Sequence, residues 1–309
     1  MILDQSHCIW EVATHLGEGP VWHAGEKALY FVDIKSRKIH RCAEDGSARQ
    51  SWDAPDQIGF ILPIMSNKGE NGDFICGLPG KLVRFSSSTG SFSTMLEVET
   101  DQPGNRLNDG YIDSQGSLWF GSMDDGEKAP SGSLYRLKYG SNALANLQAM
   151  DHDYVITNGP CMSPDGKLFY HTDTLGKKIY AFDVTPDGKL SGKRVFADIT
   201  NGGHPDGTVV DAEGFLWVAI FAGNRVERYS PAGEIVQVIS FPCSNITKVC
   251  FGGADLRTVF VTTAWKGMSA EKRAQQPLAG GLFSFRVDVP GLPQYQFSDI
   301  SSVSMHHDV

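Results

Sequence analysis

Residues 158–184 read NGPCMSPDGKLFYHTDTLGKKIYAFDV, and this module of turn, apolar strand, glycine-containing hairpin and aromatic strand recurs along the chain. Two close copies are NDGYIDSQGSLWFGSMDDGEKAPSGSLYRL and PDGTVVDAEGFLWVAIFAGNRVERYSP. The five copies besides the quoted one begin at Gly17, Leu62, Asn108, Pro205 and Thr247. A supersecondary unit that returns every 40 to 50 residues or so is typical of a β-propeller, in which each repeat forms one four-stranded blade.

The six copies therefore predict an all-β fold, a six-bladed β-propeller of four-stranded antiparallel blades, with residues 1–309 forming a single domain. Radial stacking would bury both faces of each sheet and leave only short strand edges. We expect a strand near residues 8–12 to complete the C-terminal blade and close the ring. Residues 267–278 are expected to form a loop or short helix. Three tryptophans at equivalent positions are expected to pack between blades: Trp22, Trp119 and Trp217.

Composition narrows the class of protein. The chain carries 27 basic and 36 acidic residues, a formal charge of −9, which disfavours a nucleic-acid partner because phosphate binding needs a basic surface. No stretch approaches the length of an apolar membrane span, and the first residues lack the segments of a signal peptide. Six cysteines are dispersed without CxxC pairs, as expected of reduced thiols. We expect a cytoplasmic protein without a membrane partner, monomeric or weakly oligomeric.

Oxygen-bearing side chains recur at one position of the repeat. The innermost strands of a propeller begin at the same mouth of the channel, so equivalent positions converge in space. Four blades carry an acid or an amide at this position. The two remaining blades have Ile64 and Thr247–Lys248 in the corresponding regions, so the acids are not simply part of the repeat. Asn-Gly and Asp-Gly are also ordinary turn dipeptides. Carboxylate and amide oxygens at one mouth would suit a hard divalent cation. The residues at this position are Glu18, Asn108–Asp109, Asn158 and Asp206.

The same stretches carry a resemblance to a known family. LGEGPVW, NRLNDG, NGP and PDG, followed by DAEGFLWVA, VCFGG and QPLAGGLF, resemble the regucalcin/gluconolactonase (senescence marker protein) family. The similarity covers nearly the whole chain in order. It implies a six-bladed propeller with one divalent metal ion in its channel, and hydrolysis of aldonolactones such as gluconolactone, xylonolactone or arabinonolactone.

Carried over by motif, the resemblance implies that Glu18, Asn158 and Asp206 are metal ligands and that Asp206 is also the general base. It implies that Arg106 and Asn108 bind the substrate. One departure concerns a substrate-contacting glutamate that some members have after G-S-M; within residues 124–127 (DDGE), our alignment places glycine at that position. The sugar preference therefore stays open.

Chemistry agrees with this assignment. A divalent ion can polarise a lactone carbonyl and lower the pKa of bound water, with a carboxylate removing the proton. An all-oxygen site would accept Ca²⁺, Mg²⁺, Mn²⁺, Zn²⁺ or Fe²⁺. The alternatives are a phosphotriesterase-like esterase and a calcium-binding regulatory protein on the same scaffold. Roles stay open for His171 and His204, expected near the mouth, and for Asp173, a turn residue or a support for the ligands.

Overall fold

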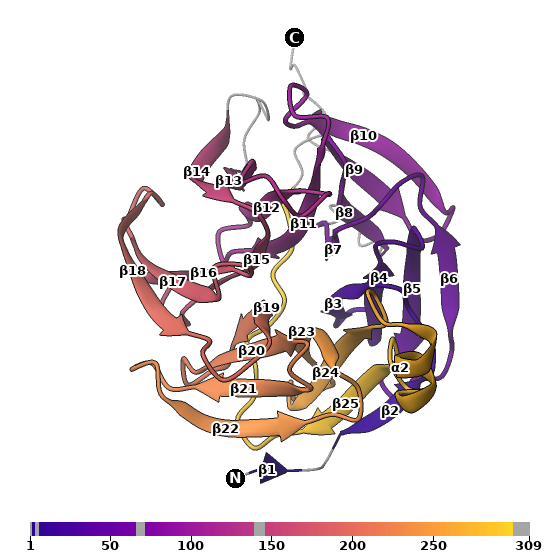
Figure 1. Ribbon diagram of the computed structural model, residues 1–309. Coiled ribbons are helices and arrows are strands. Elements are labelled where there is room, and N and C mark those ends of the chain that lie inside the picture. Colours follow the sequence, from indigo (N-terminus) through magenta and orange to yellow (C-terminus); the bar gives the residue numbers. More distant parts are fainter. Residues whose placement is uncertain (1, 4–5, 66–71, 139–145, 299–309) are drawn as a thin grey trace.

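The alternation of apolar strands with glycine-containing turns produces six sheets, which a computed structural model shows as blades around a central channel (Figure 1). The structure describes residues 2–3, 6–65, 72–138 and 146–298, with the side chains of residues 2–3 left out. We number the blades one to six in chain order, starting from the sheet that begins at Gly17. The prediction of a six-bladed, antiparallel all-β propeller is confirmed.

Each blade is a meander whose first strand is innermost. Blade one contains β3 (Gly17–His23), β4 (Ala28–Asp33), β5 (Lys38–Ala43) and β6 (Gln50–Asp53). Blade two contains β7 (Phe60–Pro63), β8 (Asp73–Leu78), β9 (Lys81–Ser86) and β10 (Ser91–Glu97). Blade three contains β11 (Asn105–Ile112), β12 (Leu118–Asp124), β13 (Gly132–Leu137) and β14 (Leu147–Tyr154).

The second half of the ring repeats this order. Blade four contains β15 (Thr157–Met162), β16 (Leu168–Asp173), β17 (Lys178–Val184) and β18 (Leu190–Asp198). Blade five contains β19 (His204–Val210), β20 (Leu216–Phe221), β21 (Arg225–Tyr229) and β22 (Ile235–Ser240), and it gains a fifth, parallel strand, β1 (Ile2–Leu3), at its outer edge. Blade six contains β23 (Asn245–Gly252), β24 (Thr258–Ala264), β25 (Leu282–Arg286) and β2 (His7–Trp10).

The N-terminal segment closes the ring as predicted. Strand β2 pairs antiparallel with β25, so one blade is built from both ends of the chain. Between β24 and β25 lies the short helix α2 (Ala270–Gln275), in the segment expected to be a loop or short helix. Ser269 caps this helix by accepting a hydrogen bond from the Lys272 N–H.

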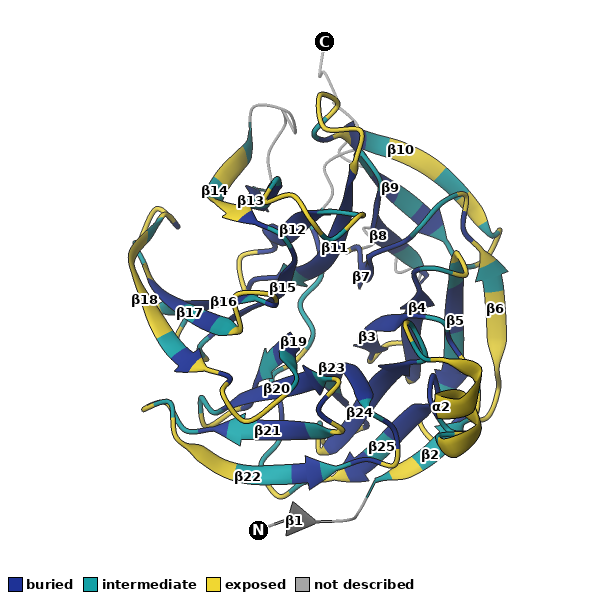
Figure 2. Ribbon diagram, viewed as in Figure 1, coloured by how far each residue is buried: buried dark blue, intermediate teal, exposed yellow. Residues whose placement is uncertain are grey.

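Burial follows the radial position of the strands. Figure 2 shows the inner strands almost wholly buried and the outermost strands, such as β6 and β18, largely exposed. The tryptophans pack between blades as predicted: Trp119 lies 4.5 Å from Phe169 of blade four, and Trp22 stacks on Phe260 of blade six. Trp217 meets Phe251 of blade six edge-on. All six cysteines are free, and no described helix is long and apolar enough to cross a membrane.

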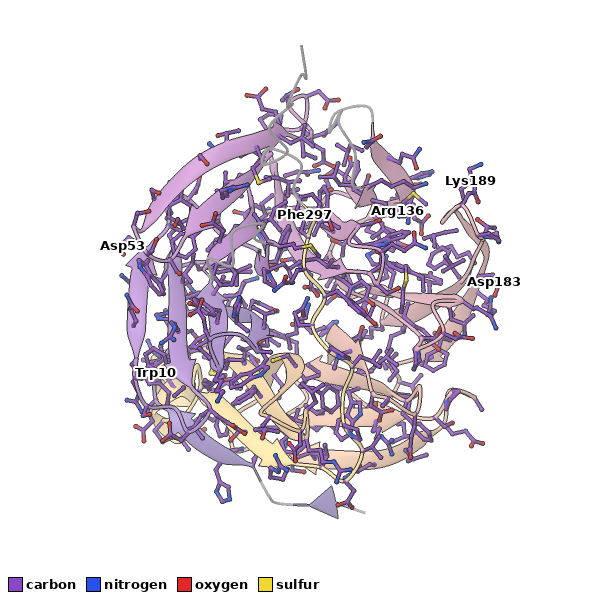
Figure 3. The ribbon with its side chains drawn as sticks, turned by 180° about the vertical axis from the view of Figure 1, so that it is seen from behind. Trp10, Asp53, Arg136, Asp183, Lys189 and Phe297 are labelled. Atoms are coloured by element: carbon purple, nitrogen blue, oxygen red, sulfur yellow. The ribbon has the colours of Figure 1, made fainter. Side chains whose placement is uncertain are left out.

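The C-terminal segment crosses the rear mouth of the channel, a feature that the repeat does not predict. From behind, the chain runs over the ring toward Phe297 (Figure 3). On its way the segment pairs with blade five, where Ala212 N–H donates to Pro290 O, and with blade two, where Phe297 N–H donates to Pro63 O. This strap leaves the opposite, front mouth as the route into the channel.

Candidate metal centre and active site

The inner strands of five blades have a register irregularity at the same place. An extra residue in a strand bends it and re-aims a side chain, which is why bulges often lie beside functional sites. The glycine-containing dipeptides of the repeat motif therefore lie inside strands rather than in hairpin turns. The irregularities fall between Glu18 and Val21, Leu107 and Gly110, Asn158 and Cys161, Pro205 and Thr208, and Ile246 and Lys248.

Two of these bulges depend on glycine directly. Gly19 has φ of 52° and Gly159 has φ of 57°, values that side-chain-bearing residues rarely adopt. A Cβ on Gly159 would also lie 2.5 Å from the Thr208 hydroxyl oxygen. The glycines after Glu18 and Asn158 thus allow the backbone turn that directs these two side chains into the channel.

The predicted site residues share one chamber of about 240 Å³. Its polar walls contain all five, brought from blades one, three, four and five: Glu18, Arg106, Asn108, Asn158 and Asp206. Leu16, Ile156, Leu175 and Phe221 supply apolar walls. Positions up to 188 residues apart in the sequence (206 minus 18) therefore converge as the repeat alignment predicts.

Two of the carboxylates that line the chamber, those of Glu18 and Asp206, are buried and poorly compensated. Glu18 and Asp206 are each 6% exposed. Glu18 accepts one hydrogen bond, from Gly19 N–H at 3.0 Å, and Asp206 makes none to the residues that the structure describes. Burial and then the negative charge of Asp109 raise the pKa of Glu18 to about 7. Burial and then Glu18 raise the pKa of Asp206 well above its usual value. Two acids that share so few donors are costly to bury unless a cation neutralises them.

The Asn158 amide is oriented by its neighbours. Its Nδ2 donates to the Thr174 hydroxyl at 3.0 Å, and its Oδ1 accepts from Asn108 Nδ2 at 2.8 Å. Asn108 is held in turn by Arg106 Nη1, which donates to Asn108 Oδ1 at 2.5 Å. An amide oxygen has a second lone pair, so Asn158 Oδ1 keeps acceptor capacity toward the chamber.

Arg106 is held in place by Asp125, which directly follows β12 of blade three. Its Nε donates to Asp125 Oδ1 at 2.8 Å, and Asp125 also accepts from Lys35 and Gln57. Burial acts to raise the pKa of Asp125, but hydrogen bonds from Gln57 and Lys35 and the charge of Arg106 bring it down to about 2. Arg106 Nη2 makes no hydrogen bond to a described residue, so one edge of the guanidinium is available to a ligand.

A second ion pair lies deeper in the channel, and the sequence analysis did not predict it. Asp109 and Lys248 bind each other across the ring, and both are nearly buried. Asp109 also accepts the N–H groups of Gly110 at 2.7 Å and Gly159 at 2.9 Å. The pair borders a smaller cavity behind the chamber, which the C-terminal strap also lines. The sequence contains one sign of this ion pair. Lys248 lies in the region of the repeat where four other blades have an acid or an amide.

The residues whose roles the sequence left undecided fall into two groups. His204 lines the chamber, and so does Glu127, one residue after the position to which we aligned the family glutamate. His171 is fully buried with neither ring nitrogen hydrogen-bonded to a described residue, and Asp173 accepts the Gly176 N–H in a turn. Neither His171 nor Asp173 lines the chamber.

The donor set fits a hard divalent cation. Among the described residues, no cluster of three or more His, Cys, Asp and Glu forms a metal site. Glu18, Asp206 and Asn158 instead offer two carboxylates and one amide oxygen. With such a set, water or substrate must supply the remaining ligands of Ca²⁺, Mg²⁺ or a transition ion. The unsatisfied Asp206 carboxylate is the feature that such a cation would stabilise.

Comparison with known proteins agrees with the motifs. Residues 16–265 match the SMP-30/gluconolactonase/LRE-like region. The chain is 32% identical to 6-deoxy-6-sulfogluconolactonase of Pseudomonas putida, covering 94% of this chain and 98% of that protein. It is 33% identical to L-arabinolactonase of Azospirillum brasilense, covering 95% and 96%. A crystal structure of regucalcin from Agrobacterium tumefaciens, described as calcium-binding, superposes with a TM-score of 0.88 at 25% identity, covering 97% and 99%. The chain belongs to the SMP-30/gluconolactonase/LRE-like family.

Proposed function

We propose that this protein is a metal-dependent sugar lactonase, which opens the ring of an aldonolactone to give the aldonic acid. The observation that carries the proposal is the pair of buried carboxylates, Glu18 and Asp206, facing one chamber with the Asn158 amide. The relatives named as lactonases of a sulfogluconolactone and of L-arabinolactone support the reaction class.

In this proposal Glu18, Asn158 and Asp206 hold one divalent cation. Such a cation, when bound, polarises a carbonyl oxygen and lowers the pKa of water. Asp206 takes the proton of the attacking water as general base, because it makes no hydrogen bond to a described residue and lies in the chamber. Burial of Glu18 and Asp206 strengthens each of these charge interactions.

Arg106 and Asn108 bind and orient the lactone. The free edge of the Arg106 guanidinium presents N–H donors to a lactone oxygen or ring hydroxyl, and Asp125 fixes the plane of that edge. Asn108 links this arginine to Asn158, so substrate position and ligand orientation are coupled through two hydrogen bonds. Fixed donors contribute more to a transition state than mobile ones because they need no reorganisation.

The substrate class is a pentonolactone or hexonolactone, with xylonolactone, arabinonolactone and gluconolactone as the compounds to test. The cation is one of Ca²⁺, Zn²⁺, Mn²⁺, Mg²⁺ and Fe²⁺. A cytoplasmic location and a monomeric or weakly associating state stay predictions from the sequence.

The decisive experiment compares chelated and metal-reloaded protein on these lactones. Chelation should abolish ring opening and one of the five cations should restore it; full activity in metal-free protein would contradict the proposal. Asp206→Asn should lose activity while keeping its fold. Asp173→Asn is the matched control, since Asp173 ends β16 of blade four and does not line the chamber.

Calcium binding without catalysis is the second candidate, favoured by the calcium-binding description of the Agrobacterium regucalcin. It predicts cation binding at the same three residues but no turnover of any lactone. Esterase activity on a phosphotriester is the third, and it predicts that a phosphotriester outperforms every sugar lactone. The same panel of lactones, with a phosphotriester added, separates all three.

A further inference from the structure

Three buried acids meet in the channel with the buried Lys248. Glu18, Asp109 and Asp206 are 6%, 2% and 6% exposed. In addition to the effect of burial, the charge of Asp109 raises the pKa of Glu18, and the charges of Glu18 and Asp109 raise the pKa of Asp206. Lys248 is 8% exposed and forms its ion pair with Asp109 from the opposite side of the ring, since β23 and β11 lie in blades six and three (Figure 1).

The inner strands leave a place for this lysine. Lys248 directly follows the register irregularity of β23. A Cβ on Gly207, the residue after Asp206, would lie 2.4 Å from Lys248 Cγ and 2.6 Å from Lys248 Cβ. The aliphatic part of Lys248 therefore occupies the space that a side chain at position 207 would need. The ammonium group is held inside the channel by packing as well as by charge.

The buried charges balance when one divalent cation is added. The three acids carry three negative charges when all are ionised, and Lys248 supplies one positive charge. The two charges that remain match one divalent cation, which buried carboxylates need as a partner. The arginine and the other lysine of the chamber do not alter this balance, because each has an acidic partner: Arg106 pairs with Asp125, and Lys266 pairs with Glu127.

The ammonium group lies where a metal ion could bind in its absence. Asp109 Oδ1 accepts from Lys248 Nζ and from Gly110 N–H, and Asp109 Oδ2 accepts from Gly159 N–H. The cavity behind the ion pair has a volume of about 70 Å³, which is room for a few water molecules. A carboxylate oxygen and several waters are common ligands of a divalent cation.

We propose that the Lys248 ammonium group takes the place of a second cation in the channel and thereby limits the metal centre to one divalent ion. The inference rests on the metal centre of the proposed function. A buried carboxylate such as Asp109 needs a positive partner, and either an ammonium group or a metal ion can fill this role. Removal of the lysine frees Asp109 to bind a second ion.

Calorimetric titration of metal-free protein with Mn²⁺ counts the ions. Wild type should bind one ion, and Lys248→Met should bind two. Lys248→Arg keeps the positive charge and should bind one. Lys193→Met is the matched control, because it removes the ammonium group of a lysine–aspartate pair on the outer strands of blades three and four, where Lys193 Nζ lies 2.6 Å from Asp151 Oδ2. It should also bind one ion.

A second pair of variants keeps the inference testable if Lys248→Met does not fold. Asp109→Asn leaves the ammonium group without its partner near the divalent cation, whereas Asp109→Asn/Lys248→Met removes both charges. Both variants lose the same carboxylate, so their difference isolates the ammonium group. The double variant should bind Mn²⁺ at least about tenfold more tightly than Asp109→Asn, because like charges repel strongly in a buried site.

The location of the second ion is also predicted. Crystals of Lys248→Met grown with Mn²⁺ should show the additional ion beside Asp109 Oδ1. One ion in Lys248→Met, or two in Lys193→Met, overturns the inference. So does an equal Mn²⁺ affinity of Asp109→Asn and the double variant.

These measurements separate the inference from the lactonase proposal, since none of them needs turnover. One ion in both wild type and Lys248→Met, with a lactone opened by the wild type, refutes only the inference. One ion in wild type and two in Lys248→Met, without hydrolysis of any lactone, refutes only the enzyme. Wild type that binds no Mn²⁺ in the channel contradicts both.

Discussion

Replacement of Lys248 with methionine tests whether the buried ion pair of Lys248 and Asp109 stabilises the fold. Methionine keeps most of the side-chain length and removes the ammonium group. The change leaves the Asp109 carboxylate beside Glu18 and Asp206, the two other acids whose pKa values its charge already raises. Asp109→Asn is the reciprocal change, and the double variant Asp109→Asn/Lys248→Met removes both charges.

The size of the effect follows from burial. The Asp109 side chain is 3% exposed, and the loss of one partner from a buried ion pair costs about 3–5 kcal/mol. Two backbone N–H groups continue to donate to Asp109, so we place Lys248→Met near the lower end, at about 3 kcal/mol. The double variant leaves neither charge of this ion pair without its partner, because both charges are gone. Replacement of both partners should therefore cost about 1 kcal/mol or less.

Guanidinium denaturation of the four proteins measures this as a coupling free energy. We expect each single variant to lose about 3 kcal/mol of stability and the double variant about 1 kcal/mol or less. The coupling free energy is then about 5 kcal/mol. Additive effects, with the double variant the least stable of the four, would refute the view that Asp109 and Lys248 compensate each other. Equal slopes of the four transitions are the check that the unfolded states are comparable.

Three further variants test other parts of the structure. Asp211→Ala removes a fully buried acceptor of the Trp217 indole N–H at 2.9 Å and should cost about 3–5 kcal/mol by thermal or chemical unfolding without changing cation affinity; a neutral effect would contradict its structural role. Gly159→Ala, with φ of 57° and a threonine oxygen 2.5 Å from the new Cβ, should weaken cation binding in calorimetry, whereas Gly166→Ala, with φ of 68° and nothing within 4 Å, should not; equal affinities would exclude the bulge as the cause. Arg106→Lys should reduce kcat/KM by about a hundredfold because the planar fork is lost, and near-normal turnover would remove Arg106 from substrate binding.

The repeat made the ring predictable. Equivalent strands in six modules fixed the number of blades, the role of strand β2 in closure and the convergence of Glu18, Asn158 and Asp206. These features depend on periodicity, which a single sequence displays directly. The tryptophans between blades were predictable for the same reason.

Other features depend on contacts between loops and ends of different blades, which periodicity does not encode. The C-terminal strap has no counterpart in the repeat, and neither does the cross-ring ion pair of Asp109 and Lys248. Glu127 lines the chamber one place after the aligned position, in the loop that follows β12, where its own φ is 57°. His171 is fully buried and does not line the chamber, and the sequence motif around it shows no sign of that.

The most direct test of the account is an anomalous difference map from crystals grown with Mn²⁺ and measured on the high-energy side of the manganese absorption edge. The account predicts one strong peak in the chamber, within bonding distance of Glu18, Asn158 and Asp206. A map without a peak there, or with manganese bound only to other residues, would contradict the central claim that these three side chains hold one cation.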